Sequence, residues 1–242
     1  MIMAKRKLAK EMKPKKHFLS RPTYYVGVDE GTRDLFPSLP YIISGGEVTE
    51  RYYFINVSKE TDNKFRVVPE FFGKESGFVQ EFPKNIRKIL GKDAAAKIFC
   101  VFDWDTIYGN QTNRAKYDGF VKKIQPYIDD GNVILCPSMP SFEYWFMLHF
   151  KNTTRLVNTC EEMAKLLRPY MMSYFSKGNV DLFKVLKSRQ YMEDSTWVKN
   201  LCAEGKLNLA IKRAEKNITD AVANGDLEEH SYSYVYKVFK KD

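Results

Sequence analysis

The sequence has few of the features that mark membrane-embedded or disulfide-stabilised proteins. It contains no apolar run approaching the ~20 residues that a membrane-spanning helix needs, and its start lacks the pattern of a secretory signal. Its four cysteines, Cys100, Cys136, Cys160 and Cys202, are widely spaced. Because Cys100 and Cys136 fall in apolar runs typical of buried strands, we expect reduced thiols in a cytoplasmic protein, with neither disulfides nor a zinc site.

Motifs of several common enzyme classes are also missing. The chain has no Gly-x-x-x-x-Gly-Lys phosphate loop, no Gly-x-Ser-x-Gly nucleophile elbow and no His-Glu-x-x-His zinc pair. We therefore do not expect an ATPase, a serine hydrolase or a zinc peptidase. The composition is that of an ordinary globular protein, and 242 residues are enough for one domain with an appendage or for two small domains.

Positive charge is concentrated at the start of the chain. The formal net charge is +9, and residues 1–21 contain eight lysines and arginines with a single glutamate. A basic arm of this kind is typical of phosphate binding, but a solvated, disordered end has the same composition, so both interpretations stay open. If the arm binds nucleic acid, the expected phosphate contacts are Lys5, Arg6, Lys7, Lys13, Lys15 and Lys16.

Strand-like and helix-like segments alternate over the first two thirds of the chain. Strands are predicted at 23–28, 39–43, 65–72, 98–102 and 132–136, and helices at 47–55, 78–90, 117–128 and 142–150. Beyond residue 152 only helices are predicted, at 161–172, 180–187 and 207–223. This order indicates an α/β protein with a parallel sheet flanked by helices. We expect a basic tail at 1–21, the α/β core at 22–150 and a helical C-terminal extension at 151–242.

The segment from Ile98 to Phe102 is a short apolar run, typical of a strand that is buried on both faces, and it ends in Asp103 and Asp105. Alternate residues of an extended chain point to the same side, so both carboxylates would emerge at the carboxyl edge of the sheet, where α/β proteins bind ligands. Carboxylate oxygens suit a hard divalent cation such as Mg²⁺. A second interpretation is that Asp103 ends the strand in a turn and Asp105 caps the next helix.

Glu143 follows the strand predicted at 132–136 and begins a helix that Ser141 could cap. A carboxylate in the first turn is stabilised by the helix dipole, which is a sufficient structural reason for it. The helix also begins at the same sheet edge as Asp103 and Asp105, so Glu143 is equally a candidate metal ligand or general base. Candidate cations for a substrate phosphate are Lys151, Arg155 and Lys177, and His149 is either a proton shuttle or a packed residue.

Separate segments of the chain resemble one known family in their order. These are Gly46-Glu-Val-Thr-Glu50 with Tyr52-Tyr-Phe54, Val101-Phe-Asp-Trp-Asp105, Pro140 to Phe150, Tyr174 to Phe183, Ala210 to Ala214 and Tyr234 to Val238. Together they resemble the RloB family, whose fold is a variant of the Toprim domain, over about residues 39–240.

The resemblance implies a function. Toprim domains use a glutamate after the first strand and an Asp-x-Asp pair to hold Mg²⁺ for phosphodiester chemistry. By similarity, this chain would be a Mg²⁺- or Mn²⁺-dependent nuclease on DNA or RNA, with Asp103 and Asp105 as metal ligands. RloB-like proteins are thought of as effectors of anti-phage defence or abortive infection, often encoded beside ATPases. The alternative is a catalytically silent nucleic-acid-binding subunit that docks on a partner ATPase.

One position departs from the family pattern. The family's first strand usually ends in glutamate-glycine, whereas this chain has Gly45 and Gly46. Glu47 could enter the site from the glycine turn, and Glu50 on the following helix matches the family's own Thr-Glu pair. We expect Glu47 first and Glu50 second to act with Glu143 in place of the missing acid. Equally, the missing acid is compatible with a changed mechanism or with an inactive site, and Gly45 is therefore the feature that favours the silent-subunit alternative.

The basic arm generates the first prediction. Deleting residues 2–16 should weaken nucleic-acid binding about equally for all sequences. It should also flatten the salt dependence, because each phosphate contact contributes about −0.9 to the slope of log K against log salt on duplex DNA. The measurement is a titration of labelled duplex at several salt concentrations, with the full chain as reference. An unchanged slope would show that the arm makes no phosphate contacts.

Overall fold

The computed structural model describes residues 39–68, 78–175 and 181–240 of the chain. The basic arm, the strand predicted at 23–28 and Lys177 lie outside the described residues.

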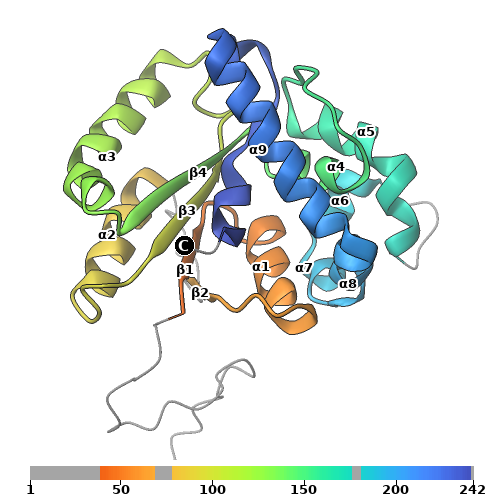
Figure 1. Ribbon diagram of the computed structural model, residues 1–242, viewed down its shortest axis with the longest axis horizontal. Helices are drawn as coiled ribbons and strands as arrows, with labels where there is room; N and C mark the ends of the chain where they lie inside the picture. The colour runs from red at the N-terminus through yellow and green to blue at the C-terminus, as the bar shows by residue number, and fades with distance from the viewer. Residues whose placement is uncertain (1–38, 69–77, 176–180, 241–242) are drawn as a thin grey trace, which may run out of the picture. The chain divides into compact units, whose positions relative to one another are not determined.

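A five-stranded sheet with the order β2-β1-β3-β4-β5 forms the centre of the described structure (Figure 1). Strands β1 (Tyr41–Ser44), β2 (Arg66–Val68), β3 (Ile98–Asp103) and β4 (Val133–Met139) run parallel, and β5 (Tyr232–Ser233) pairs antiparallel to β4. The first five residues of β3 are buried, as their continuous apolar run predicts. The predicted α/β class is confirmed, with one antiparallel edge strand added to the parallel sheet.

Helices cover both faces of this sheet. These are α1 (Thr49–Glu60), α2 (Phe78–Leu90), α3 (Gln111–Asp129), α4 (Glu143–Phe150) and α9 (Lys206–Asn224). Figure 1 shows α2 and α3 on one face and α1, α4 and α9 on the other. Helix α3 begins earlier than the expected residue 117, because the side chain of Asn110 accepts the Asn113 N–H at 3.0 Å and caps the helix there.

The remaining C-terminal helices pack around α1 and α4. They are α5 (Cys160–Met171), α6 (Leu182–Leu186), α7 (Arg189–Met192) and α8 (Thr196–Cys202). The 3₁₀ segment Tyr234–Phe239 follows β5, and Phe239 stacks on Trp145 of α4 with ring centroids 5.6 Å apart. Within the described ranges, no helix is both long enough and apolar enough to span a bilayer.

The strand order creates a crevice between the carboxyl ends of β1 and β3. The connection through α1 leads from β1 to β2 on one side, whereas β3 lies on the other side of β1. The two connections also place their helices on opposite faces of the sheet (Figure 1). Such a reversal is the place where open α/β sheets bind ligands.

Two buried hydrogen bonds fix α1 to the C-terminal helices. The Thr49 hydroxyl donates to the Leu186 carbonyl at 2.8 Å, and the Asn56 amide donates to the Met192 carbonyl at 2.8 Å. Thr49 begins α1 and Leu186 ends α6, so the first bond sets the position of the residues that follow α6.

Replacing Thr49 with valine should therefore destabilise the fold. Valine keeps the shape of threonine but leaves the buried Leu186 carbonyl without its donor, which costs about 1–3 kcal/mol of unfolding free energy. Urea denaturation followed by circular dichroism measures the change. Thr49→Ser retains the hydroxyl and should stay closer to the wild type; equal stability of Thr49→Val and the wild type would contradict the role of this bond.

Candidate active site

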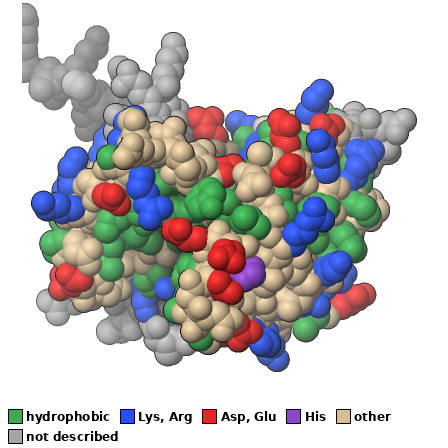
Figure 2. Space-filling model, turned by 90° about the horizontal axis from the view of Figure 1, so that it is seen from above, with side chains coloured by type: hydrophobic (Ala, Val, Ile, Leu, Met, Phe, Trp, Pro, Cys, Tyr) green, Lys and Arg blue, Asp and Glu red, His purple; other side chains and the backbone are tan. Residues whose placement is uncertain are grey.

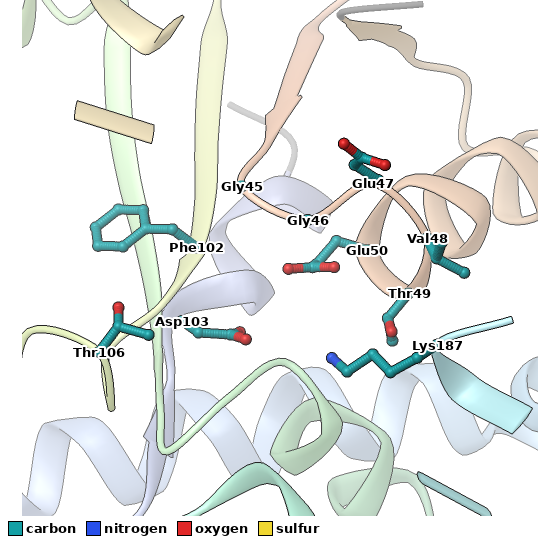
Figure 3. A pocket seen from close by; sticks show the side chains of 10 residues that line it. All are labelled: Gly45, Gly46, Glu47, Val48, Thr49, Glu50, Phe102, Asp103, Thr106 and Lys187. Atoms are coloured by element: carbon teal, nitrogen blue, oxygen red, sulfur yellow. The ribbon is translucent and has the colours of Figure 1, made fainter. Parts of the chain in front are cut away.

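A cavity of about 370 Å³ opens at the carboxyl ends of β1 and β3, in the crevice that the strand order creates (Figure 3). It is lined by Gly45, Gly46, Glu47, Val48, Thr49, Glu50, Phe102, Asp103, Thr106 and Lys187. Three of these side chains, those of Glu50, Asp103 and Lys187, are directed toward the same space in Figure 3. The loop after β1, the end of β3 and the residue after α6 thus meet at one place.

Glu50 is buried in the first turn of α1, and its carboxylate lies directly against the bare backbone of Gly46. A Cβ atom at residue 46 would lie 2.2 Å from Oε2 of Glu50, so any side chain there would displace the carboxylate. Gly46 therefore makes room for Glu50 to reach the edge of the sheet beside Asp103.

Gly45 is equally confined, but by the backbone of the neighbouring strand. Its N–H donates to the Val101 carbonyl at 2.7 Å, and a Cβ atom at residue 45 would lie 3.2 Å from Cβ of Phe102. This is the position where the resemblance places a glutamate. An acid here would require β3 to shift by a few tenths of an ångström.

Glu47 also borders the cavity, but it is exposed and its carboxylate points away from Asp103 in Figure 3. Of the two glutamates expected to replace the missing acid, Glu50 is the one that the structure places beside Asp103.

Asp103 connects β3 to α4. Its Oδ1 accepts the N–H of Phe142 at 2.8 Å, just before the first turn of α4. Ser141 was expected to cap this helix, but its hydroxyl has no hydrogen-bond partner among the described residues. No side chain of the described residues caps α4; the bond from Phe142 instead joins the end of β3 to the residue before the helix and fixes one carboxylate oxygen of Asp103 in place.

Asp105 lies in the turn that follows β3, where its N–H donates to the Pro140 carbonyl at 3.0 Å. It is partly exposed and close enough to Asp103 for the two carboxylates to repel each other. The cap of α3 is Asn110, so the alternative that Asp105 caps the next helix is wrong.

Glu143 is the first residue of α4 and is fully buried. Its Oε1 lies 3.1 Å from Nζ of Lys187, whose side chain is 41% exposed. Its Oε2 is buried without a hydrogen-bond partner in the part of the chain that the structure describes. Lys187 was not among the basic residues expected at the site, and nothing in its sequence context marks it out from other lysines.

The electrostatics of this cluster follow from burial and from the mutual repulsion of the carboxylates. Burial, together with the charges of Glu50 and Glu143, raises the pKa of Asp103 well above its usual range. Burial also raises the pKa of Glu50, which Lys187 partly offsets, and that of Asp105. Burial opposes ionisation of Glu143 too, but the Lys187 ammonium, together with the Ser141 hydroxyl, the backbone N–H of Glu143 and the Cys160 thiol, lowers the pKa of Glu143. The same carboxylates raise the pKa of Lys187 against its desolvation, so the Lys187–Glu143 pair is ionised.

Other expected participants lie elsewhere. His149 is buried against Trp145, with Nδ1 3.0 Å from the Trp145 carbonyl, and desolvation lowers its pKa to about 3. This is the packed alternative rather than a proton shuttle. Lys151 and Arg155 line a different, smaller cavity, with Tyr170.

The residues fit a hard divalent cation by their chemistry. All the acidic side chains offer carboxylate oxygens, one buried oxygen of Glu143 lacks a partner, and Gly46 leaves a space that Glu50 fills. As the side chains stand, however, no three potential metal-ligating residues within the described ranges converge closely enough to coordinate an ion. Cation binding would thus require these side chains to move.

Comparison with known proteins gives one match. The model of the family described as RloB-like protein matches residues 41–241. No curated protein and no solved structure matches the chain.

The raised pKa of Asp103 generates a prediction about stability. The pKa is higher in the folded state than the unfolded value of about 3.8, so ionised Asp103 destabilises the fold at pH values above the folded pKa. At pH 8, Asp103→Asn should be more stable than the wild type by more than the ~0.5 kcal/mol that ordinary surface substitutions produce. Asparagine also keeps an oxygen that can accept the Phe142 N–H.

This gain should shrink as the pH falls through the raised pKa and vanish below about pH 3.8, where Asp103 is protonated in both states. Urea denaturation across this pH range measures it. Asp118→Asn, at an exposed position of α3, is the matched control and should show little change. A constant difference between Asp103→Asn and the wild type at every pH would contradict the explanation.

Proposed function

The chain belongs to the RloB-like protein family, and from that premise we propose that it is a Mg²⁺- or Mn²⁺-dependent nuclease that cleaves phosphodiester bonds of DNA or RNA. The observation that supports this activity best is the meeting of Glu50, Asp103 and Lys187 in one cavity at the reversal of strand order. The proposed role as an effector in anti-phage defence rests on the family resemblance alone.

The acidic residues would divide between binding the cation and accepting a proton. The Phe142 N–H fixes Asp103, which would hold the cation together with Asp105, and the first turn of α1 positions Glu50 beside them. Once bound, the cation would polarise the scissile phosphate and lower the pKa of an attacking water molecule.

The remaining task is to accept a proton from that water. Burial and like charges raise the pKa of Glu50, which brings it closer to the pH at which a general base works best. Glu143 is held ionised by Lys187 and is suited to stay charged, either as an additional cation ligand or as a second acceptor. The cluster thus contains carboxylates with different proton affinities, as acid-base chemistry requires.

A catalytically silent nucleic-acid-binding subunit that docks on a partner ATPase is the second candidate. Gly45 favours this candidate, because the residue that follows β1 is not an acid and the neighbouring β3 leaves little room for a side chain there. Lys187 favours this candidate too, since its ammonium pairs with Glu143 and so neutralises this carboxylate without a metal ion.

A cleavage assay distinguishes the two candidates. The purified full chain is incubated with total tRNA, with plasmid and with single-stranded DNA, each in Mg²⁺, in Mn²⁺ and in EDTA. Products that form with either cation and disappear in EDTA support the nuclease. Binding without cleavage of any of these substrates supports the silent subunit.

Gly46→Ala provides a test of the site that changes no charge. The added methyl group must displace the end of the Glu50 side chain, whose three carboxylate atoms are its nearest neighbours. We expect cleavage to fall on the order of 10²-fold, because small misplacements of a catalytic group have effects of that size.

The matched control is Gly119→Ala on α3, where a Cβ meets nothing within 4 Å. It should keep wild-type activity and be slightly stabilised, by about 0.5–1 kcal/mol, because alanine favours a helix interior. Full activity of Gly46→Ala would exclude Glu50 from the site. Loss of activity in both variants would point to a general folding defect.

A further inference from the structure

We propose that Lys187 is a built-in counterion that competes with a divalent cation for the carboxylate cluster and leaves Glu143 when that cation binds, to face the substrate phosphate. This inference rests on the proposed function for the identity of the substrate, but its central claim concerns the binding of the cation alone.

The first argument is the asymmetry of the Lys187–Glu143 pair. Glu143 is fully buried on α4, whereas the Lys187 side chain is 41% exposed and its ammonium lies 3.1 Å from Oε1. The carboxylate is therefore the fixed member and the ammonium the movable one. Oε2 of Glu143 is buried and makes no close hydrogen bond within the described residues, although the Ser141 hydroxyl and the Cys160 thiol also stabilise this carboxylate, so Oε2 is the oxygen that a second cation would contact.

The second argument is where Lys187 is anchored. Its backbone follows α6, whose last carbonyl, that of Leu186, accepts the buried hydrogen bond from Thr49. Thr49 immediately precedes Glu50, so the backbone of Lys187 is fixed relative to the cavity. Its four-carbon side chain has the rotational freedom to move the ammonium within that cavity.

The third argument is the balance of charge. Glu50, Asp103, Asp105 and Glu143 all interact electrostatically with one another or with Lys187, which is the cation that the structure places among them. A divalent ion on the same carboxylates would repel an ammonium a few ångströms away, where an interaction of two charges is still several kcal/mol at an effective dielectric constant of 20. Both cations cannot keep their best positions, and the ammonium is the one that can move.

This competition also explains why no three potential ligands converge in the described structure. The carboxylates are arranged around an ammonium, which accepts looser geometry than a metal ion does. When it leaves Glu143, the ammonium remains at the edge of the cavity, which Lys187 lines together with Glu50 and Asp103. There it can neutralise charge on a phosphate, and this would make Lys187 a catalytic residue.

The test is the affinity for Mn²⁺ without nucleic acid, measured by isothermal titration calorimetry on the full chain. Lys187→Met removes the ammonium and keeps much of the side-chain volume, so we expect Mn²⁺ to bind at least ~10-fold more tightly. Thermal unfolding should show a correspondingly larger stabilisation by Mn²⁺ in this variant than in the wild type. Lys187→Arg keeps the charge and should not tighten binding. Lys184→Met is the matched control and should behave like the wild type, because Lys184 is an exposed lysine of α6, three residues before Lys187.

Lys187→Met leaves Glu143 without its partner and could prevent folding. In that case Lys187→Gln serves as the second variant, because its amide can still donate to Oε1 of Glu143, and it should also bind Mn²⁺ more tightly. Unchanged or weaker Mn²⁺ binding in the folded variants would overturn the inference, as would an absence of Mn²⁺ binding in all of them.

Cleavage assays on the same proteins separate this inference from the proposed function. If the chain is a nuclease, Lys187→Met should bind Mn²⁺ more tightly yet cleave on the order of 10²-fold more slowly, a combination that a purely structural lysine would not produce. If Mn²⁺ binds the variant more tightly but the wild type does not cleave, the counterion inference is supported and the nuclease proposal is refuted. If the wild type cleaves but the variants do not bind Mn²⁺ more tightly, the nuclease proposal is supported and the counterion inference is refuted.

Discussion

The buried carboxylate of Glu143 is the constraint on which the arrangement of this site depends. An ionised group that is removed from water must be compensated, and its uncompensated burial would cost several kcal/mol. The compensation comes from Lys187, which lies 44 residues further along the chain. Lys187 follows α6, which packs against α5 and α7 and is joined to the start of α1 by the Thr49–Leu186 hydrogen bond. The C-terminal helices therefore complete the cavity, in addition to covering the sheet.

The fold class could be predicted because its signals are local. The apolar run from Ile98 to Phe102, the alternation of strands and helices and the acids after β3 are all patterns of adjacent residues. β5 has two residues and α7 has four, which are too few to show a period. Lys187 could not be found either, since its role depends on an ion pair between distant helices. The flexibility of the glycine turn favours Glu47 over Glu50 as the replacement acid. In the structure, however, Glu50 is the residue that lies over the backbone of Gly46, because it follows Gly46 by four residues in the first turn of the helix.

Gly45 and Gly46 make room for different neighbours in the turn that follows β1. The backbone at residue 45 packs against β3 so closely that a side chain would press on Phe102. Gly46 has no side chain, so the carboxylate of Glu50 lies against its backbone, and this acid from the first turn of α1 is directed toward the space beside Asp103. The two glycines therefore matter for different reasons, because a side chain at residue 46 would displace Glu50, whereas one at residue 45 would press on β3.

The energetic cost of the cluster bears on the choice between an active and a silent site. The core beside the cluster is apolar and contains Phe102, Phe142 and Trp145, none of which offers a charge to compensate the four acids. Burial and mutual repulsion raise the pKa of Asp103, Glu50 and Asp105, and each shift records a destabilisation of the charged form. A subunit that only docks and binds nucleic acid would gain stability by losing such a cluster. A site that must hold a cation against a phosphate needs it, which is why perturbed carboxylates concentrated in a cavity at the reversal of strand order favour catalysis over a silent role.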